Sequence, residues 1–162
     1  MDDDTAAVST RAADPADLDE MVALLPRLAD YDLPANRTAD MFWSSDARLL
    51  ASWSRGDEPE VFVRVATVDS QIVGVAMVTM GEDHFSHQRC GHLEAVAIAP
   101  VVDGLGVGRR LIEECEEAIV DRGGELISLH VMGNNHRARR VYERLGFAEE
   151  MIRATKFLDS SS

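Results

Sequence analysis

Residues 92–111, with the sequence HLEAVAIAPVVDGLGVGRRL, decide the fold of this chain. The apolar run over residues 93–99 is too short for a long helix and predicts a buried central strand. Pro100 ends that strand because proline has no backbone N–H to donate to a sheet. Asp103 and Gly104 then predict a turn, and the residues that follow predict the start of a helix.

Three alternating glycines, Gly104, Gly106 and Gly108, lie between this strand and this helix. Without a Cβ the backbone there can approach a ligand closely, and its N–H groups lie at a helix start, where anions bind. A tight connection with no ligand is the alternative interpretation. Two familiar phosphate-binding patterns do not fit. The dinucleotide fingerprint would need its third glycine at Arg109, and the Gly-Lys-Ser/Thr ending of the P-loop does not occur in the sequence.

A second block covers residues 135–147, NHRARRVYERLGF. Together the two blocks resemble the hallmark motifs of the GNAT acetyltransferase superfamily, over about residues 60–157. The first matches P-x-x-[R/Q]-G-x-G-x-G/A at Pro100, Gly104, Gly106 and Gly108. The second matches N-x-x-A-x-x-x-Y-x-x-x-G-F at Asn135, Ala138, Tyr142, Gly146 and Phe147.

Asp103 departs from the first motif, which has Arg or Gln at this position. A carboxylate beside a phosphate site would repel the ligand unless it points to solvent, caps the next helix, forms an Asp-Gly turn or pairs with a cation such as Arg109. We expect a cap or a turn.

The length and composition indicate one domain, since 162 residues with 46% hydrophobic content can bury one core. We expect this domain over residues 14–158, a disordered segment over residues 1–13 and a frayed tail over residues 159–162.

No apolar run in the sequence approaches membrane-spanning length, and the first residues are acidic where a signal peptide would be basic. The sequence therefore predicts a cytoplasmic protein without a membrane partner.

The net charge of −13 argues against nucleic-acid binding, because the chain has no surplus of cations to bind phosphates. It is compatible with a cationic substrate, and also with a genome-wide or saline-environment bias in composition.

Two cysteines, Cys90 and Cys115, are too few for a disulfide framework, and we expect both to be packing residues. His84, His87, Cys90 and His92 have a spacing that fits no familiar zinc site, so we expect no metal.

The remaining periodicities complete the expected order of elements. A helix begins at Asp14 and Pro15 and ends near Asp30, and a partly irregular helix covers residues 35–53. Strands are expected over residues 61–69, 71–80, 124–132 and 147–158, with an amphipathic helix over residues 105–121 and a short one that Asn134 or Asn135 caps. This order predicts an α/β domain with a mixed sheet. The resemblance implies a mainly antiparallel central sheet flanked by helices.

The resemblance implies acetyl-CoA as cosubstrate. Its pantetheine arm would pair with the backbone of Val96, Ala97 and Ile98, as an added strand does. The pyrophosphate would bind to backbone amides of the glycine-rich turn, and Asn135 also belongs to the cofactor-binding residues. That turn consists of Gly104, Leu105, Gly106, Val107, Gly108 and Arg109.

The resemblance also implies catalytic roles for two residues. Glu94 would be the general base, acting directly or through water, and His92 is the alternative base or a proton relay. Tyr142 would protonate the CoA thiolate as it leaves, although a tyrosine on a short helix can also be a core residue. Tyr31, Phe42, Trp43 and Trp53 are candidates for the acceptor walls, with core packing as the alternative.

We therefore expect an N-acetyltransferase that transfers acetyl to a primary amine by direct attack. A small amine, an aminoglycoside-like compound, a peptide N-terminus and a protein lysine are all open as acceptors, and a homodimer is compatible with the resemblance. The rival hypothesis is a non-catalytic acyl-CoA-binding sensor or partner-binding module. Amine-dependent release of the CoA thiol distinguishes the two.

Overall fold

The computed structural model describes residues 7–159. The strands in these residues are β1 (Ser9–Ala12), β2 (Val61–Val68), β3 (Gln71–Glu82), β4 (Arg89–Ile98) and β5 (Leu126–Leu129). The α-helices are α1 (Leu18–Leu24), α2 (Ser44–Ser54), α3 (Val107–Asp121) and α4 (His136–Arg144). Short 3-10 helices are η1 (Pro15–Asp17), η2 (Leu25–Ala29), η3 (Ala39–Phe42) and η4 (Pro100–Val102).

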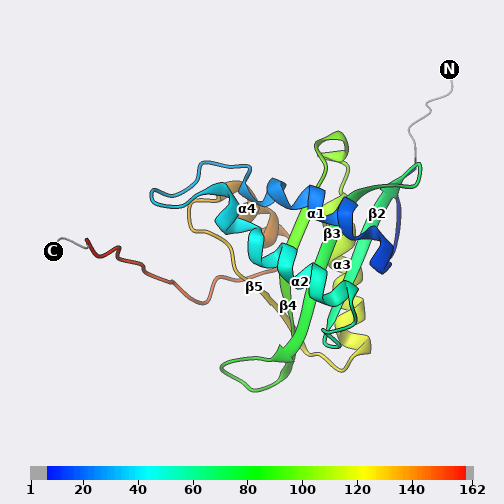
Figure 1. Ribbon diagram of the computed structural model, residues 1–162. Coiled ribbons are helices and arrows are strands. Elements are labelled where there is room, and N and C mark those ends of the chain that lie inside the picture. The colour runs from blue at the N-terminus through cyan, green and yellow to red at the C-terminus, as the bar shows by residue number, and fades with distance from the viewer. Residues whose placement is uncertain (1–6, 160–162) are drawn as a thin grey trace.

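A single sheet contains the strands in the order β1-β2-β3-β4-β5 (Figure 1). Neighbouring strands from β1 to β4 are antiparallel, whereas β4 and β5 are parallel. The predicted mixed, mainly antiparallel sheet is confirmed. The 3-10 and α elements between Pro15 and Ala29 confirm the first helix, and η3 with α2 confirms the partly irregular second one.

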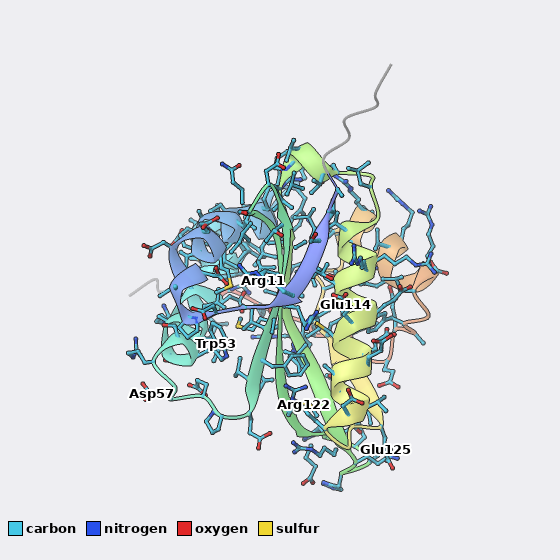
Figure 2. All side chains as sticks on the ribbon, turned by 90° about the vertical axis from the view of Figure 1, so that its right-hand side faces the viewer. Arg11, Trp53, Asp57, Glu114, Arg122 and Glu125 are labelled. Carbon is cyan, nitrogen blue, oxygen red and sulfur yellow. The ribbon has the colours of Figure 1, made fainter. Side chains whose placement is uncertain are left out.

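Both faces of the sheet are covered by helices, as the edge-on view in Figure 2 shows. Under α1 and α2 lies a buried cluster that includes Met21, Leu25 and Leu50. Under α3 lies a second cluster that includes Leu111 and Cys115. The two-sided burial explains why β3 is almost continuously apolar, as a central strand should be. Cys90 and Cys115 are both buried free thiols, which confirms their packing role.

The expected disorder over residues 1–13 is wrong for residues 9–12, which form β1. This strand pairs antiparallel with β2, which would otherwise be a sheet edge. In addition, the Thr10 hydroxyl donates a hydrogen bond to Glu114 of α3 at 2.6 Å. A polar segment can therefore be ordered by edge pairing rather than by burial. Residues 1–6 of the expected disordered segment lie outside the described residues.

The strand expected over residues 147–158 is also wrong. Residues 147–159 form neither helix nor strand, and Figure 1 shows this segment leading away from the sheet. In the described residues the sheet ends at β5, so this alternating apolar pattern has no partner strand, and Ile152 is 98% exposed. The described helices include none that is long and apolar enough to cross a membrane.

Gly91 of β4 allows α3 to pack closely on the sheet. A Cβ at Gly91 would lie 2.3 Å from Cδ1 and 2.4 Å from Cγ1 of Ile119, which is 2% exposed and has little room to move. We predict that Gly91→Ala lowers the free energy of unfolding in urea by about 1–3 kcal/mol through overpacking. Gly81→Ala on β3 is the control, because a Cβ there meets nothing within 4 Å. Equal losses in the two variants would contradict this packing argument.

Candidate active site

The pairing of β4 with β5 is short and leaves the end of β4 open on that side. The pairs run only from Cys90 and Leu126 to Leu93 and Leu129, whereas β4 continues to Ile98. On its other edge β4 is paired with β3, and beyond the end of β4 the Ala99 N–H still donates a hydrogen bond to the Val73 carbonyl of β3 at 2.8 Å. Alternate residues of a strand direct their backbone groups to opposite edges.

Val96 and Ile98 therefore direct their backbone groups to the open edge. Ala97 directs its groups to β3, where it pairs with Val75, and its side chain is buried in the core. Three residues were expected to pair with a pantetheine arm through their backbone. The register leaves two of them, Val96 and Ile98, with backbone groups directed to the open edge. One group is already engaged, because the Ile98 carbonyl accepts a hydrogen bond from Arg27 Nε at 3.0 Å.

A cavity of about 140 Å³ lies beside this open edge. Its walls come from β4, from the segment that follows β5, from α4 and from the chain between η2 and α2. Most lining side chains are apolar. The polar and titratable ones are Tyr31, Asp46, Glu94, His130, Asn135 and Tyr142.

A β-bulge in β4 brings Glu94 to the cavity. Met77 of β3 pairs with Ala95 and Val78 pairs with Leu93, so Glu94 is the extra residue of the bulge. Leu93 packs in the cluster under α3, and Ala95 packs in the cluster under α1 and α2. In a regular strand these two side chains would share a face. The bulge therefore interrupts the regular alternation of faces between His92 and Glu94.

Asp46, in the first turn of α2, lines the same cavity as Glu94. Burial raises the pKa of Asp46 to about 7, and the negative charge of Glu94 contributes to the rise. Asp46 therefore changes charge near neutral pH. An acidic residue in the first turn of a helix is common, so the sequence contained no signal that singled out Asp46.

His92 lies close to His130, and the charge of Glu94 also acts on it. The rings of His92 and His130 are 4.7 Å apart at 57°, and His92 Nδ1 lies 2.9 Å from Ser128 Oγ. Burial lowers the pKa of His92, the charge of His130 lowers it further, and Glu94 opposes the change. A neutral imidazole can accept a proton, so His92 keeps its place as an alternative base or relay. His130, which lines the cavity, was missed because its nearness to His92 follows from β4–β5 pairing.

The helix α4 brings the second motif to the cavity. Asn135 caps it by accepting the Ala138 N–H at 3.3 Å, which confirms a predicted cap. Asn135, Ala138 and Tyr142 line the cavity together, because spacings of three and four place side chains on one helix face. Tyr142 packs edge-on against Phe147 at 5.7 Å. Burial raises the pKa of Tyr142, so the phenol stays protonated at neutral pH.

The glycine-rich turn lies past the end of β4. Asp103 (φ −56°, ψ 137°) and Gly104 (φ 77°) occupy the centre of a type II turn, closed by Leu105 N–H and the Val102 carbonyl at 3.2 Å. This confirms the predicted Asp-Gly turn. Gly106 (φ 75°) is then the N-cap of α3.

The start of α3 offers free backbone donors. Arg110 N–H donates to the Gly106 carbonyl at 3.0 Å, so by helix geometry the amides of Val107, Gly108 and Arg109 have no partner within the helix. The Arg109 side chain is exposed and bonds through Nε to Glu113 at 2.8 Å.

Asp103 has a different partner from the ones expected. Its carboxylate accepts a hydrogen bond from Arg27 Nη2 at 3.0 Å, and Arg27 also forms an ion pair with Asp30. Asp103 therefore neither caps α3 nor pairs with Arg109. Through Asp103 and the Ile98 carbonyl, Arg27 joins η2 to the glycine-rich turn and to the end of β4.

The four aromatic residues expected at the acceptor walls divide into two groups. Tyr31 and Phe42 line the cavity and pack edge-on against each other at 5.9 Å. Trp43 and Trp53 pack against the core cluster under α1 and α2 instead. Over residues 7–159 no group of three or more His, Cys, Asp or Glu side chains is arranged to hold a metal ion.

Comparison with known proteins gives a consistent result. Residues 25–147 match the model of the acetyltransferase (GNAT) family. The chain is 28% identical over 149 residues to aminoalkylphosphonate N-acetyltransferase of Salmonella typhimurium, covering 91% of this chain and 90% of that protein. It is 28% identical over 156 residues to thialysine N-epsilon-acetyltransferase of Bos taurus, covering 92% and 88%.

A solved structure has the same fold. AAC(6')-Iy in complex with the bisubstrate analog CoA-S-monomethyl-acetylneamine superposes with a TM-score of 0.69 and 18% identity, covering 96% of this chain and 99% of that chain.

The half-buried Asp46 carboxyl makes the stability of the fold depend on pH. Its pKa is about 7 in the folded state against 3.8 for the free group, so the folded state holds a proton that the unfolded state loses between those values. Stability therefore falls as pH rises through this window. We predict that Asp46→Asn stabilises the fold at pH 8 by roughly 1–3 kcal/mol, with a gain that disappears near pH 4. Urea unfolding at both pH values measures it, with Asp40→Asn as an exposed control, and a gain independent of pH would contradict it.

Proposed function

The chain belongs to the acetyltransferase (GNAT) family, and from that premise we propose that it transfers the acetyl group of acetyl-CoA to a small primary amine. The observation that carries this proposal is the meeting of Glu94 and Tyr142 in one cavity beside the open edge of β4. One side chain can accept a proton there and the other can donate one. Two relatives support a small acceptor, since their names specify an aminoalkylphosphonate and thialysine as substrates.

Acetyl-CoA fits the open edge and the start of α3. The amide groups of its pantetheine arm would pair with both backbone groups of Val96 and with the Ile98 N–H. Its pyrophosphate would accept hydrogen bonds from the amides of Val107, Gly108 and Arg109, where the helix dipole also favours negative charge. The positive φ of Gly104 and Gly106 gives the turn the shape that exposes these amides.

Glu94 would serve as the general base. An alkylammonium with a pKa near 10.4 is only about one part in 2,500 neutral at pH 7, a cost of roughly 4.6 kcal/mol. Glu94 takes up a proton of the ammonium, directly or through water, and the neutral nitrogen then attacks the acetyl carbonyl with its lone pair. The bulge supports this role because it brings the carboxylate to the cavity. His92 and His130 can carry the proton onward.

Tyr142 would serve as the general acid. As the C–N bond forms and the C–S bond breaks, the sulfur leaves as a thiolate that needs a proton. The Tyr142 phenol can supply it, because burial keeps this side chain protonated at neutral pH.

Release of the CoA thiol across a panel of amines tests this function, with mass spectrometry to identify the N-acetyl product. Amine-dependent release supports the proposal. Binding of acetyl-CoA without turnover on a broad panel would contradict it and favour a sensor.

We predict that Tyr142→Phe lowers kcat by about 10²- to 10⁴-fold, because the proton donor is lost. Affinity for acetyl-CoA, measured by calorimetry, and the unfolding midpoint should stay close to those of the original protein. An unchanged kcat, with chemistry shown to be rate-limiting, would mean that another group protonates the thiolate or that none is needed.

We predict that Glu94→Gln lowers kcat/KM by about 10²- to 10⁴-fold and removes the acidic limb of its pH profile, since the free enzyme loses its base. Glu143→Gln is the matched control, because Glu143 is an exposed carboxylate on α4 outside the cavity. An acidic limb that survives in Glu94→Gln would rule out Glu94 as the base and leave His92 as the next candidate.

A further inference from the structure

The charge of the cavity restricts the acceptor. Two carboxylates, Asp46 and Glu94, line it, and neither lysine nor arginine is among the described residues of its walls. The nearby Arg27 is held by Asp30, Asp103 and the Ile98 carbonyl. An acceptor that enters this cavity therefore meets negative charge without a compensating cation from the protein.

Asp46 lacks a partner within residues 7–159. Its carboxylate takes part in neither a hydrogen bond nor an ion pair there, and the forces on it are burial and the repulsion of Glu94. A half-buried carboxylate beside another one is unfavourable unless a cation or a donor compensates it. Glu94 has a task in the proposed reaction, whereas Asp46 has none.

A second polar group in the cavity wall is also without a partner. The hydroxyl oxygen of Tyr31 is buried and forms no hydrogen bond within the described part of the chain. Burial raises the pKa of Tyr31, so this group stays neutral and can accept a hydrogen bond from an ammonium. The rings of Tyr31 and Phe42 form an aromatic wall that also attracts a cation.

We propose that the acceptor is a short aliphatic diamine, whose second ammonium binds to Asp46 and the Tyr31 hydroxyl while its first reacts beside Glu94. This inference rests on the proposed function and adds the class of acceptor to it. Each ammonium then meets one carboxylate, so the paired charges compensate each other inside the cavity. A doubly charged acceptor also explains why the cavity wall contains the Asp46 carboxylate, which has no role in the proposed chemistry at Glu94.

The same charges disfavour an anionic acceptor. An aminoalkylphosphonate, the substrate in the name of one relative, carries an anionic group that needs cationic or N–H donors. The cavity instead presents Asp46 to such a group. The two chains therefore differ in acceptor according to this proposal, although they share the family.

The test uses matched acceptors. Kinetics are measured with 1,3-diaminopropane and 1,4-diaminobutane, with propylamine and butylamine as single-charge controls, and with 2-aminoethylphosphonate. We expect kcat/KM for each diamine to exceed that of its matched monoamine by about 10- to 100-fold, the range for a hydrogen bond to a charged group. Asp46→Asn should abolish this preference, because it raises the KM for diamines by the same factor of about 10 to 100. Asp40→Asn, an exposed carboxylate on η3 outside the cavity, should change none of these values.

Calorimetry separates the inference from the proposed function. Binding of 1,3-diaminopropane is measured in the presence of CoA, which cannot transfer an acetyl group. Binding that weakens in Asp46→Asn supports the diamine site, even if no amine were acetylated and the proposed function failed. Equal use of diamines and monoamines, or a preference for 2-aminoethylphosphonate, would overturn the inference and leave the N-acetyltransferase proposal intact.

Discussion

The candidate site depends on one structural constraint, which is the end of β4–β5 pairing at Leu93 and Leu129. Beyond that point β4 has backbone groups that β3 does not use, and such groups need hydrogen-bond partners. The protein satisfies one of them, the Ile98 carbonyl, with Arg27. The rest face the cavity region, where an extended ligand with amide groups could complete the edge.

The surrounding elements are fixed to this open edge by packing on both faces of the sheet. α3 packs closely on the sheet at Gly91, and its start follows the end of β4 after η4 and the glycine-rich turn. α4 is placed so that one of its faces reaches the cavity, and the bulge at Glu94 turns a carboxylate toward it. The proposed chemistry and ligand binding would therefore use three backbone features that the apolar core holds in place, namely an open edge, a bulge and a helix start.

The sequence was informative where function depends on local spacing. The glycine-rich turn, the Asn135 cap and the three-and-four spacing that carries Tyr142 to the cavity can all be predicted from neighbouring residues. Asp46, His130 and the contact of Arg27 with Asp103 could not, because each depends on which segments the tertiary fold brings together. The expected strand over residues 147–158 failed for the same reason, since an alternating pattern forms a strand only where a partner edge exists.

Amide hydrogen exchange, measured by NMR with and without CoA, tests whether the open edge of β4 and the start of α3 bind the cofactor. Val96 directs its N–H to the open edge, whereas Ala97 pairs with β3. We expect CoA to slow exchange at the Val96 amide and at the first amides of α3, and to leave exchange at Ala97 nearly unchanged. CoA binding that leaves Val96 and the start of α3 unprotected would contradict it.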